Sequence, residues 1–219
     1  RPVMILCDQR NPMFFGTKRS FKSVVAAQCA ALIAWSALDH GDRIGAMVLG
    51  NNSELDFRPK QRAQHVLQIL KAINECNHQL TEAKPMQTKL GDGLLHLKQT
   101  MTPGTTLYII SDFYDLTDKD KDALFSLKRH NHVVALQIYD ALERETPPPG
   151  LYPVTDGLDH GILDTQSKHT QNSYKQALSV WQNTIEKSFK HLGINHQQID
   201  AGDIPFGALK LAIEQRGRS

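Results

Sequence analysis

An α/β fold built on an open, doubly wound and mostly parallel sheet is predicted, because short apolar runs alternate with segments of helical length. Val3–Cys7 is a continuous apolar run that ends at Asp8, and Thr105–Ser111 ends in the same way at Asp112. Strands buried on both faces of a parallel sheet have this composition. Helices between such strands imply right-handed crossovers with helices flanking the sheet.

Three further elements and one loop are predicted between the first strand and residue 57. The segment 24–35 is too long for a strand and apolar nearly all round, which predicts a deeply buried helix. After Gly41-Asp42, the run 43–49 is typical of a second strand, and 54–57 is expected to pair with it as an antiparallel edge strand. A polar loop, 9–20, joins the first strand to the first helix.

The rest of the chain continues the alternation and adds one insertion. Apolar residues recur at helical spacing over 66–73 and over 90–97. A proline-rich stretch precedes a small hairpin insertion predicted over 151–165. The other expected elements are a helix over 118–129, a strand over 132–139, a helix with one apolar face over 174–192, a strand over 194–199 and a last helix near 206–213.

Composition limits the classes of function. A length of 219 residues favours a single domain over 1–219, and the formal charge of +2 argues against nucleic acid as a partner. Cys7, Cys29 and Cys76 form no Cys-x-x-Cys pair, which argues against a disulfide framework and a zinc site and fits a cytoplasmic location. No apolar run reaches the roughly 20 residues of a membrane span, so no membrane insertion is expected. A strand that starts at Pro2 or Val3 suggests a fragment lacking an N-terminal region.

Three polar residues follow strands or precede a helix where a ligand site is expected. In open α/β sheets the carboxyl ends of the strands converge on one edge, and ligands bind there. Asp8 and Asp112 occupy such ends, and Thr88 can reach the same edge from the start of the helix near Leu90. Carboxylate and hydroxyl oxygens suit Mg²⁺ or Mn²⁺.

These residues also carry a resemblance that covers essentially the whole chain. The chain resembles the bacterial von Willebrand factor A-like domain family of unknown function that is numbered 58 in its series and is typically encoded beside MoxR-type AAA+ ATPases. The matching fragments, in order, are Asp8 with Met13-Phe14-Phe15-Gly16, Gly41-Asp42-Arg43-Ile44-Gly45, Thr88-Lys89-Leu90, Ile110-Ser111-Asp112-Phe113 and Val133-Val134-Ala135-Leu136.

The resemblance implies a metal-ion-dependent adhesion site in which Asp-x-Ser-x-Ser is joined by a Thr and an Asp from later loops. Asp8, Thr88 and Asp112 match three of these ligands, but Arg10 and Pro12 stand where the two serines are expected. Proline offers no side-chain ligand, and a guanidinium within about 4 Å of a divalent ion repels it by several kcal/mol. We therefore expect a degenerate site without a cofactor, in which Arg10 pairs with Asp8 or Asp112 in place of the ion.

The predicted function is a non-catalytic protein–protein interaction module. Its partner, on the strength of the resemblance, is a MoxR-type AAA+ ATPase or a client of that ATPase. An ion pair between Arg10 and a carboxylate of the partner could replace the metal bridge. The predicted binding rim consists of Asp8, Arg10, Asn11, Thr88 and Asp112.

Three alternatives stay open. One is an adhesion-type domain that keeps Mg²⁺ or Mn²⁺ on Asp8, Thr88 and Asp112, and another is a metal-dependent hydrolase that uses Asp8 and Asp112. The third is a structural domain whose rim only scaffolds the absent N-terminal region. No Gly-x-Ser-x-Gly or P-loop motif supports an enzyme. The aspartates at 115, 118, 120 and 122 are expected to cap and favourably charge the start of the next helix.

Overall fold

A computed structural model describes residues 1–80, 86–145, 147–155, 160–203 and 207. Within them, a six-stranded sheet has the order β3-β2-β1-β4-β5-β8, and every neighbouring pair is parallel except β2 with β3. The predicted doubly wound α/β fold with one antiparallel edge strand is confirmed. The strands are β1 (Pro2–Asp8), β2 (Arg43–Leu49), β3 (Glu54–Lys60), β4 (Thr106–Ser111), β5 (His132–Tyr139) and β8 (Asn195–Asp200).

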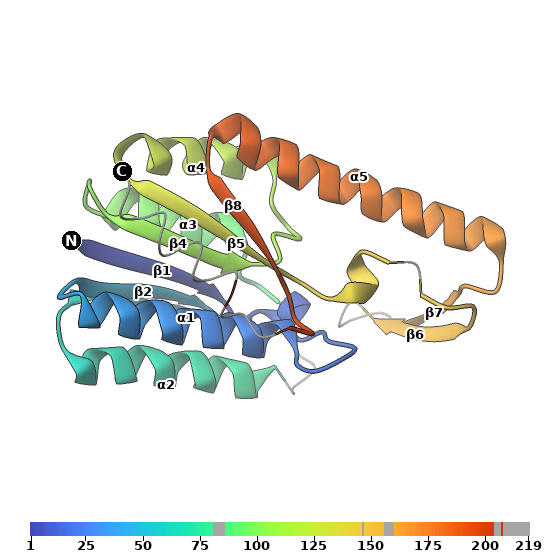
Figure 1. Cartoon of the computed structure of the whole chain (residues 1–219), viewed down its shortest axis with the longest axis horizontal. Helices are drawn as coiled ribbons and strands as arrows, with labels where there is room; N and C mark the ends of the chain where they lie inside the picture. The colour runs from blue at the N-terminus through green and yellow to red at the C-terminus, as the bar shows by residue number, and fades with distance from the viewer. Residues whose placement is uncertain (81–85, 146, 156–159, 204–206, 208–219) are drawn as a thin grey trace.

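Helices cover both faces of this sheet (Figure 1). On one face lie α1 (Lys22–Asp39) and α2 (Ala63–Gln79), and on the other lie α3 (Leu90–Thr100), α4 (Asp118–His130) and α5 (Lys168–Leu192). Alternate residues of β1 serve the two sides: Ile5 belongs to the core with α1 and α2, whereas Leu6 belongs to the core with α3, α4 and α5. The interior positions of β1 therefore carry apolar side chains on both faces of the sheet.

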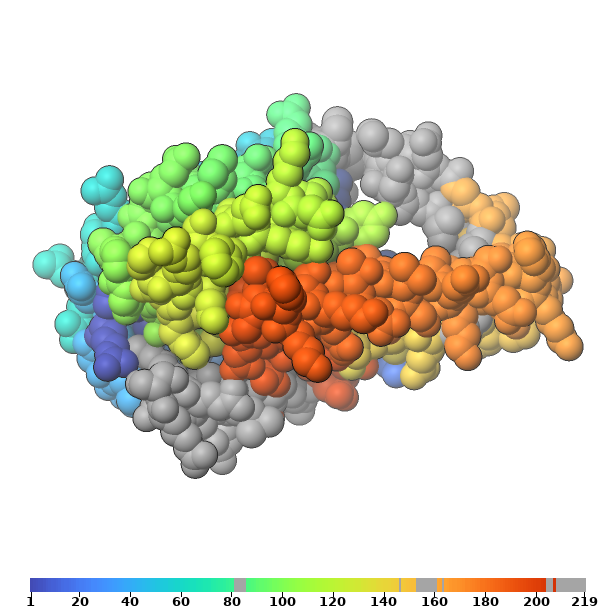
Figure 2. Space-filling model, turned by 90° about the horizontal axis from the view of Figure 1, so that it is seen from above, coloured from blue at the N-terminus to red at the C-terminus, as the bar shows by residue number. Residues whose placement is uncertain are grey.

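The hairpin and the first half of α5 project beyond the carboxyl ends of β1 and β4 (Figures 1 and 2). The hairpin consists of β6 (Leu151–Thr155) and β7 (His160–Asp164), and it follows a short 3-10 helix, η2 (Ala141–Glu143). Hydrogen bonds fasten α5 to η2, from the Tyr174 hydroxyl to the carbonyl of Leu142 and from the Gln182 side chain to the carbonyl of Glu143.

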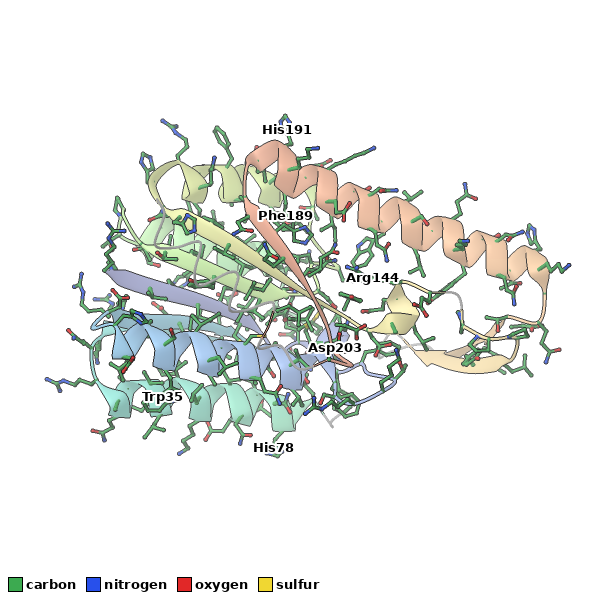
Figure 3. The ribbon with its side chains drawn as sticks, in the orientation of Figure 1. Trp35, His78, Arg144, Phe189, His191 and Asp203 are labelled. Carbon is green, nitrogen blue, oxygen red and sulfur yellow. The ribbon has the colours of Figure 1, made fainter. Side chains whose placement is uncertain are left out.

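Several element boundaries differ from the sequence-based ones by a few residues, and one burial prediction is wrong. Helix α1 is not buried all round: Leu32 and Trp35 are about two-fifths exposed, and Trp35 is labelled in Figure 3. Its buried apolar side consists of alanines together with Val25, Cys29 and Ile33, and Leu32 and Trp35 lie on the outer side. The helix predicted near 206–213 lies outside the described residues, apart from residue 207. Of the helices described, none combines the length and apolarity needed to cross a membrane.

Candidate functional site

The site lies where β1 and β4 end side by side. The chain leaves β1 for α1 on one face of the sheet and leaves β4 for α4 on the other (Figure 1), and the point where it does so is where open α/β sheets bind ligands. Asp8 is the last residue of β1, and Asp112 directly follows β4. Both side chains are 1% exposed, so the strands deliver two carboxylates to a buried position.

Arg10 fills the space beside Asp8. Its Nε and Nη2 atoms donate to the two carboxylate oxygens of Asp8 at 2.9 and 2.8 Å. Nη1 and Nη2 also donate to the two oxygens of Asp115 at 2.6 and 3.0 Å, and Nη1 donates to the carbonyl of Thr88 at 3.3 Å. All five N–H groups of a guanidinium are accounted for by these bonds. Arg10 is therefore a buried cross-link between the loops after β1 and β4 and the start of α3.

A second buried cation holds Asp112. Lys22, the first residue of α1, donates from Nζ to Asp112 at 2.8 Å and to Glu143 of η2 at 2.6 Å. The Lys22 side chain is 1% exposed, and the ring of Phe15 lies 5.9 Å from its ammonium. Lys22 thus joins α1, the end of β4 and the base of the projecting hairpin and α5.

The pKa values of these groups follow from burial opposed by charge. Burial alone would lower the pKa values of Arg10 and Lys22, but the adjacent carboxylates outweigh it and raise both. Burial would raise the pKa of Asp115, but its hydrogen bonds and charge interaction with Arg10 lower it. For Glu143, burial prevails over the Lys22 charge and the pKa is raised.

The turn after β4 fixes how Asp112 is presented. The Asp112 carboxylate accepts from the backbone N–H of Tyr114 at 3.0 Å, and the Ser111 hydroxyl donates to Asp8 while it accepts from the N–H of Phe113. Phe113 has a φ of 60°, which is unfavourable for a residue with a side chain. This backbone conformation sends Asp112 towards Lys22 and the Phe113 ring into the core against Phe189, labelled in Figure 3.

Thr88 and Asn11, the other two residues of the predicted binding rim, hold the loops around the site through hydrogen bonds. The Thr88 hydroxyl donates to the carbonyl of Gly50, and the backbone N–H of Thr88 donates to the carbonyl of Asn51. Asn11 and Asn51 exchange hydrogen bonds, with the Asn11 backbone N–H donating to the Asn51 side chain at 2.7 Å. Both Thr88 and Asn11 are half-buried.

This arrangement does not fit a divalent cation. Both oxygens of Asp8 accept from Arg10, one oxygen of Asp112 accepts from Lys22, and the Thr88 hydroxyl is directed at Gly50. A metal at this point would face two fixed positive charges, each costing several kcal/mol of repulsion. No group of three or more metal-ligating side chains is formed by the residues that the structure describes.

The sequence placed some site residues together correctly and missed others. Asp8 and Arg10 pair, but Asp112 pairs with Lys22 and not with Arg10. Asp115 does not serve the start of α4; it accepts from Arg10 and from the backbone N–H of Leu90 at the start of α3. At the start of α4, Thr117 and Asp120 form the capping box. Lys22 and Glu143 belong to no recognised sequence motif and were not predicted as site residues. A lysine at the start of an otherwise apolar helix was the one sequence feature that could have indicated a buried cation.

The internal pairing also changes the expected role of Arg10. The predicted direct pair between Arg10 and a carboxylate of a partner is not available in this conformation, because Arg10 is 1% exposed and its donors are already used. Asp8 and Asp112 are equally buried. A partner would contact the exposed residues around this site and not the ion pairs themselves.

Comparison with known proteins places the chain in one family. A sequence model described as "Protein of unknown function DUF58" matches residues 1–183. No curated protein matches the sequence significantly.

Solved structures share the fold at low sequence identity. A conserved hypothetical protein, BatB from Bacteroides thetaiotaomicron, superposes with a TM-score of 0.60 at 13% identity, covering 100% of this chain and 99% of its own. An aerotolerance-related membrane protein from Bacteroides fragilis gives a TM-score of 0.58 at 13% identity, with 98% of each chain covered.

Proposed function

This chain belongs to the DUF58 family, and we propose that it is a non-catalytic protein-interaction domain whose central site is held by two built-in cations in place of a metal ion. The observation that carries the proposal is the pairing of Arg10 with Asp8 and Asp115 and of Lys22 with Asp112 and Glu143. In this proposal, Arg10 and Lys22 neutralise and position the buried carboxylates, as a metal ion does in an adhesion site.

The same pairing argues against the enzyme alternative. A hydrolase at this position needs a carboxylate that can accept a proton or bind an activating metal. The carboxylates of Asp8 and Asp112 are buried and hydrogen-bonded to cations, so neither is presented to a substrate. A protein-binding role needs no such group, since exposed residues around a rigid site are sufficient for it.

The finer part of the proposal concerns the partner. The resemblance to domains encoded beside MoxR-type AAA+ ATPases makes such an ATPase, or a client of it, the partner that we propose. A cytoplasmic location belongs to the same proposal, because the ATPase requires ATP. The hairpin and the first half of α5 flank the rim, so a partner seated there would also meet the projecting part of the domain (Figure 1).

Two measurements test the proposal. Calorimetric titration of the whole chain with Mg²⁺ and with Mn²⁺ should give no binding heat, and micromolar binding that Asp112→Ala abolishes would overturn the metal-free site. The second measurement is binding of this chain to a purified MoxR-type ATPase encoded beside it, followed by biolayer interferometry in the absence of nucleotide. Addition of a chelator should leave this binding unchanged. Loss of binding in chelator would favour the adhesion-type alternative with Mg²⁺ or Mn²⁺.

A further inference from the structure

We propose that residues 14–21, here called the aromatic loop, dock an acidic peptide segment of a partner protein that also carries apolar side chains. The inference rests on the proposed function and names the contact surface and the chemistry of the partner. The loop has the sequence Phe-Phe-Gly-Thr-Lys-Arg-Ser-Phe and lies directly over the buried site. None of these residues was among those predicted to bind.

Three aromatic rings of the loop face solvent. Phe14, Phe15 and Phe21 are 36%, 39% and 42% exposed, and the rings of Phe14 and Phe21 pack with their centroids 4.5 Å apart. Tyr114, in the loop after the neighbouring strand β4, is 69% exposed. Aromatic side chains concentrated on a surface next to a buried polar site are typical of the residues that dominate binding energy in protein interfaces.

The loop is held in one shape before any partner arrives. The backbone N–H of Lys22 donates to the carbonyl of Phe15 and closes the loop. Thr17 donates from its backbone N–H and its hydroxyl to the two oxygens of Asp140 at 2.8 and 2.6 Å, which ties the loop to the end of β5. Gly16 lies so close to the carbonyl of Ser20 that a Cβ would clash with it. A loop fixed in this way loses little conformational entropy on binding.

The charge of the loop indicates the charge of the partner. Lys18 and Arg19 are exposed, and neither forms an ion pair with any residue of the described part of the chain. The loop contains no acidic residue, and the carboxylates of Asp115 and Glu143 already pair with Arg10 and Lys22. The carboxylate of Asp140 accepts from Thr17 and from the backbone N–H of Leu142, and Asp200 borders Gly202 together with the Lys18 side chain without forming an ion pair with it. Two exposed cations outside any ion pair of the described residues, beside three exposed rings, therefore favour a segment with carboxylates and apolar side chains.

Selection from a random peptide library displayed on phage tests this without naming a partner in advance. Immobilised wild-type chain should enrich peptides that combine Asp or Glu with Leu, Ile, Phe or similar side chains. The double variant Lys18→Glu/Arg19→Glu should lose this enrichment, and Phe14→Ser should weaken binding of an enriched peptide by about tenfold or more, as expected for an interface aromatic.

Matched controls come from α4. Lys128→Glu/Arg129→Glu reverses an adjacent, exposed Lys-Arg pair, and Phe125→Ser removes a ring that is 53% exposed. Both controls should keep the wild-type enrichment and affinity. The docking proposal would be overturned if the selected peptides lacked acidic residues, or if the loop variants and the control variants had equal effects. Neither result bears on binding of the MoxR-type ATPase, which the interferometry measurement tests separately.

A lipid surface is the other occupant that aromatic and basic residues could suit. Sedimentation with vesicles of phosphatidylcholine and phosphatidylserine distinguishes it. We expect no binding to these vesicles. The proposal would be overturned, and the loop assigned to a membrane, if the chain bound the anionic vesicles, if Phe14→Ser or Lys18→Glu/Arg19→Glu abolished that binding, and if no acidic peptides were selected.

Discussion

The ammonium of Lys22 lies 2.8 Å from Oδ2 of Asp112, although both side chains are almost completely buried and their residues are 90 positions apart in the chain. The pair joins the start of α1 to the end of β4 across the point where the chain leaves the sheet towards opposite faces. Because Glu143 shares the same ammonium, the pair also fixes η2 and, through it, α5.

Removal of the Lys22 charge should destabilise the domain strongly. Lys22→Met keeps the length of the side chain but leaves Asp112 and Glu143 buried without a cation, which is expected to cost about 3–5 kcal/mol at neutral pH. The effect should shrink in acid, because burial raises the pKa of Glu143 and its protonation removes one of the carboxylate charges left without a cation. Urea unfolding followed by circular dichroism measures it, and Lys22→Met/Asp112→Asn should recover part of the loss. A single variant as stable as the wild type would contradict the buried pair.

Substitution of Arg10 by lysine should be costly even though the charge is kept. Lysine cannot reproduce the planar fork that meets both oxygens of Asp8 and both oxygens of Asp115. Arg10→Lys is expected to lose about 2–4 kcal/mol of unfolding free energy, from several weakened charge-assisted hydrogen bonds. The exposed Arg129→Lys is the control and should change stability by less than about 0.5 kcal/mol. Equal stabilities of the two variants in urea would exclude the cross-link.

Acid should weaken the domain partly through Asp115. Its pKa in the folded state is lowered below the ordinary value of 3.8, so its contribution to stability is present above pH 3.8 and is lost as the pH falls through the folded-state value. The difference in unfolding free energy between wild type and Asp115→Asn should therefore be largest near neutral pH and shrink below pH 3.8. Chemical unfolding across a pH series measures this difference.

Asp118 is a matched control that distinguishes a buried ion pair from an exposed one. The pKa of Asp118 is also lowered, by its exposed pair with Lys121. High salt should abolish the effect of Asp118→Asn, because it screens exposed pairs, while the effect of Asp115→Asn persists. If salt removed both effects equally, the pairing of Asp115 with Arg10 would not be a buried one.

The sequence predicted the alternation of strands and helices because apolar runs and helical periodicity are local signals. Asp8 and Asp112 could be placed at the same sheet edge because parallel strands end together. The pair of Arg10 with Asp8 was within reach of the sequence, because the two residues are close in the chain. The pairs of Lys22 with Asp112 and of Asp115 with Arg10 were not, since the positions of the start of α1 and of the loop after β4 depend on tertiary packing. Asp115 lies in an acidic stretch where helix capping is the usual role, and its hydrogen bonds from Arg10 and from the backbone N–H of Leu90 distinguish it from its neighbours.

The left-handed conformation of Phe113 should reverse the usual order of alanine and glycine variants. Phe113→Ala should cost about 3–5 kcal/mol, because the ring is buried against Phe189 with centroids 4.9 Å apart. Phe113→Gly loses the same ring but also relieves a φ of 60°, which disfavours a residue with a Cβ by about 1–2 kcal/mol. The added freedom of glycine in the unfolded chain offsets about 0.5–1 kcal/mol of that gain.

Phe113→Gly should therefore be at least as stable as Phe113→Ala, by up to about 1 kcal/mol. Phe189 provides the control, because it forms the other half of the contact from within α5, where glycine is about 1 kcal/mol less favourable than alanine. Thermal and urea unfolding of the four variants should give opposite orders at the two positions. Glycine less stable than alanine at both would mean that residue 113 carries no backbone strain, and the turn that directs Asp112 towards Lys22 would need another cause.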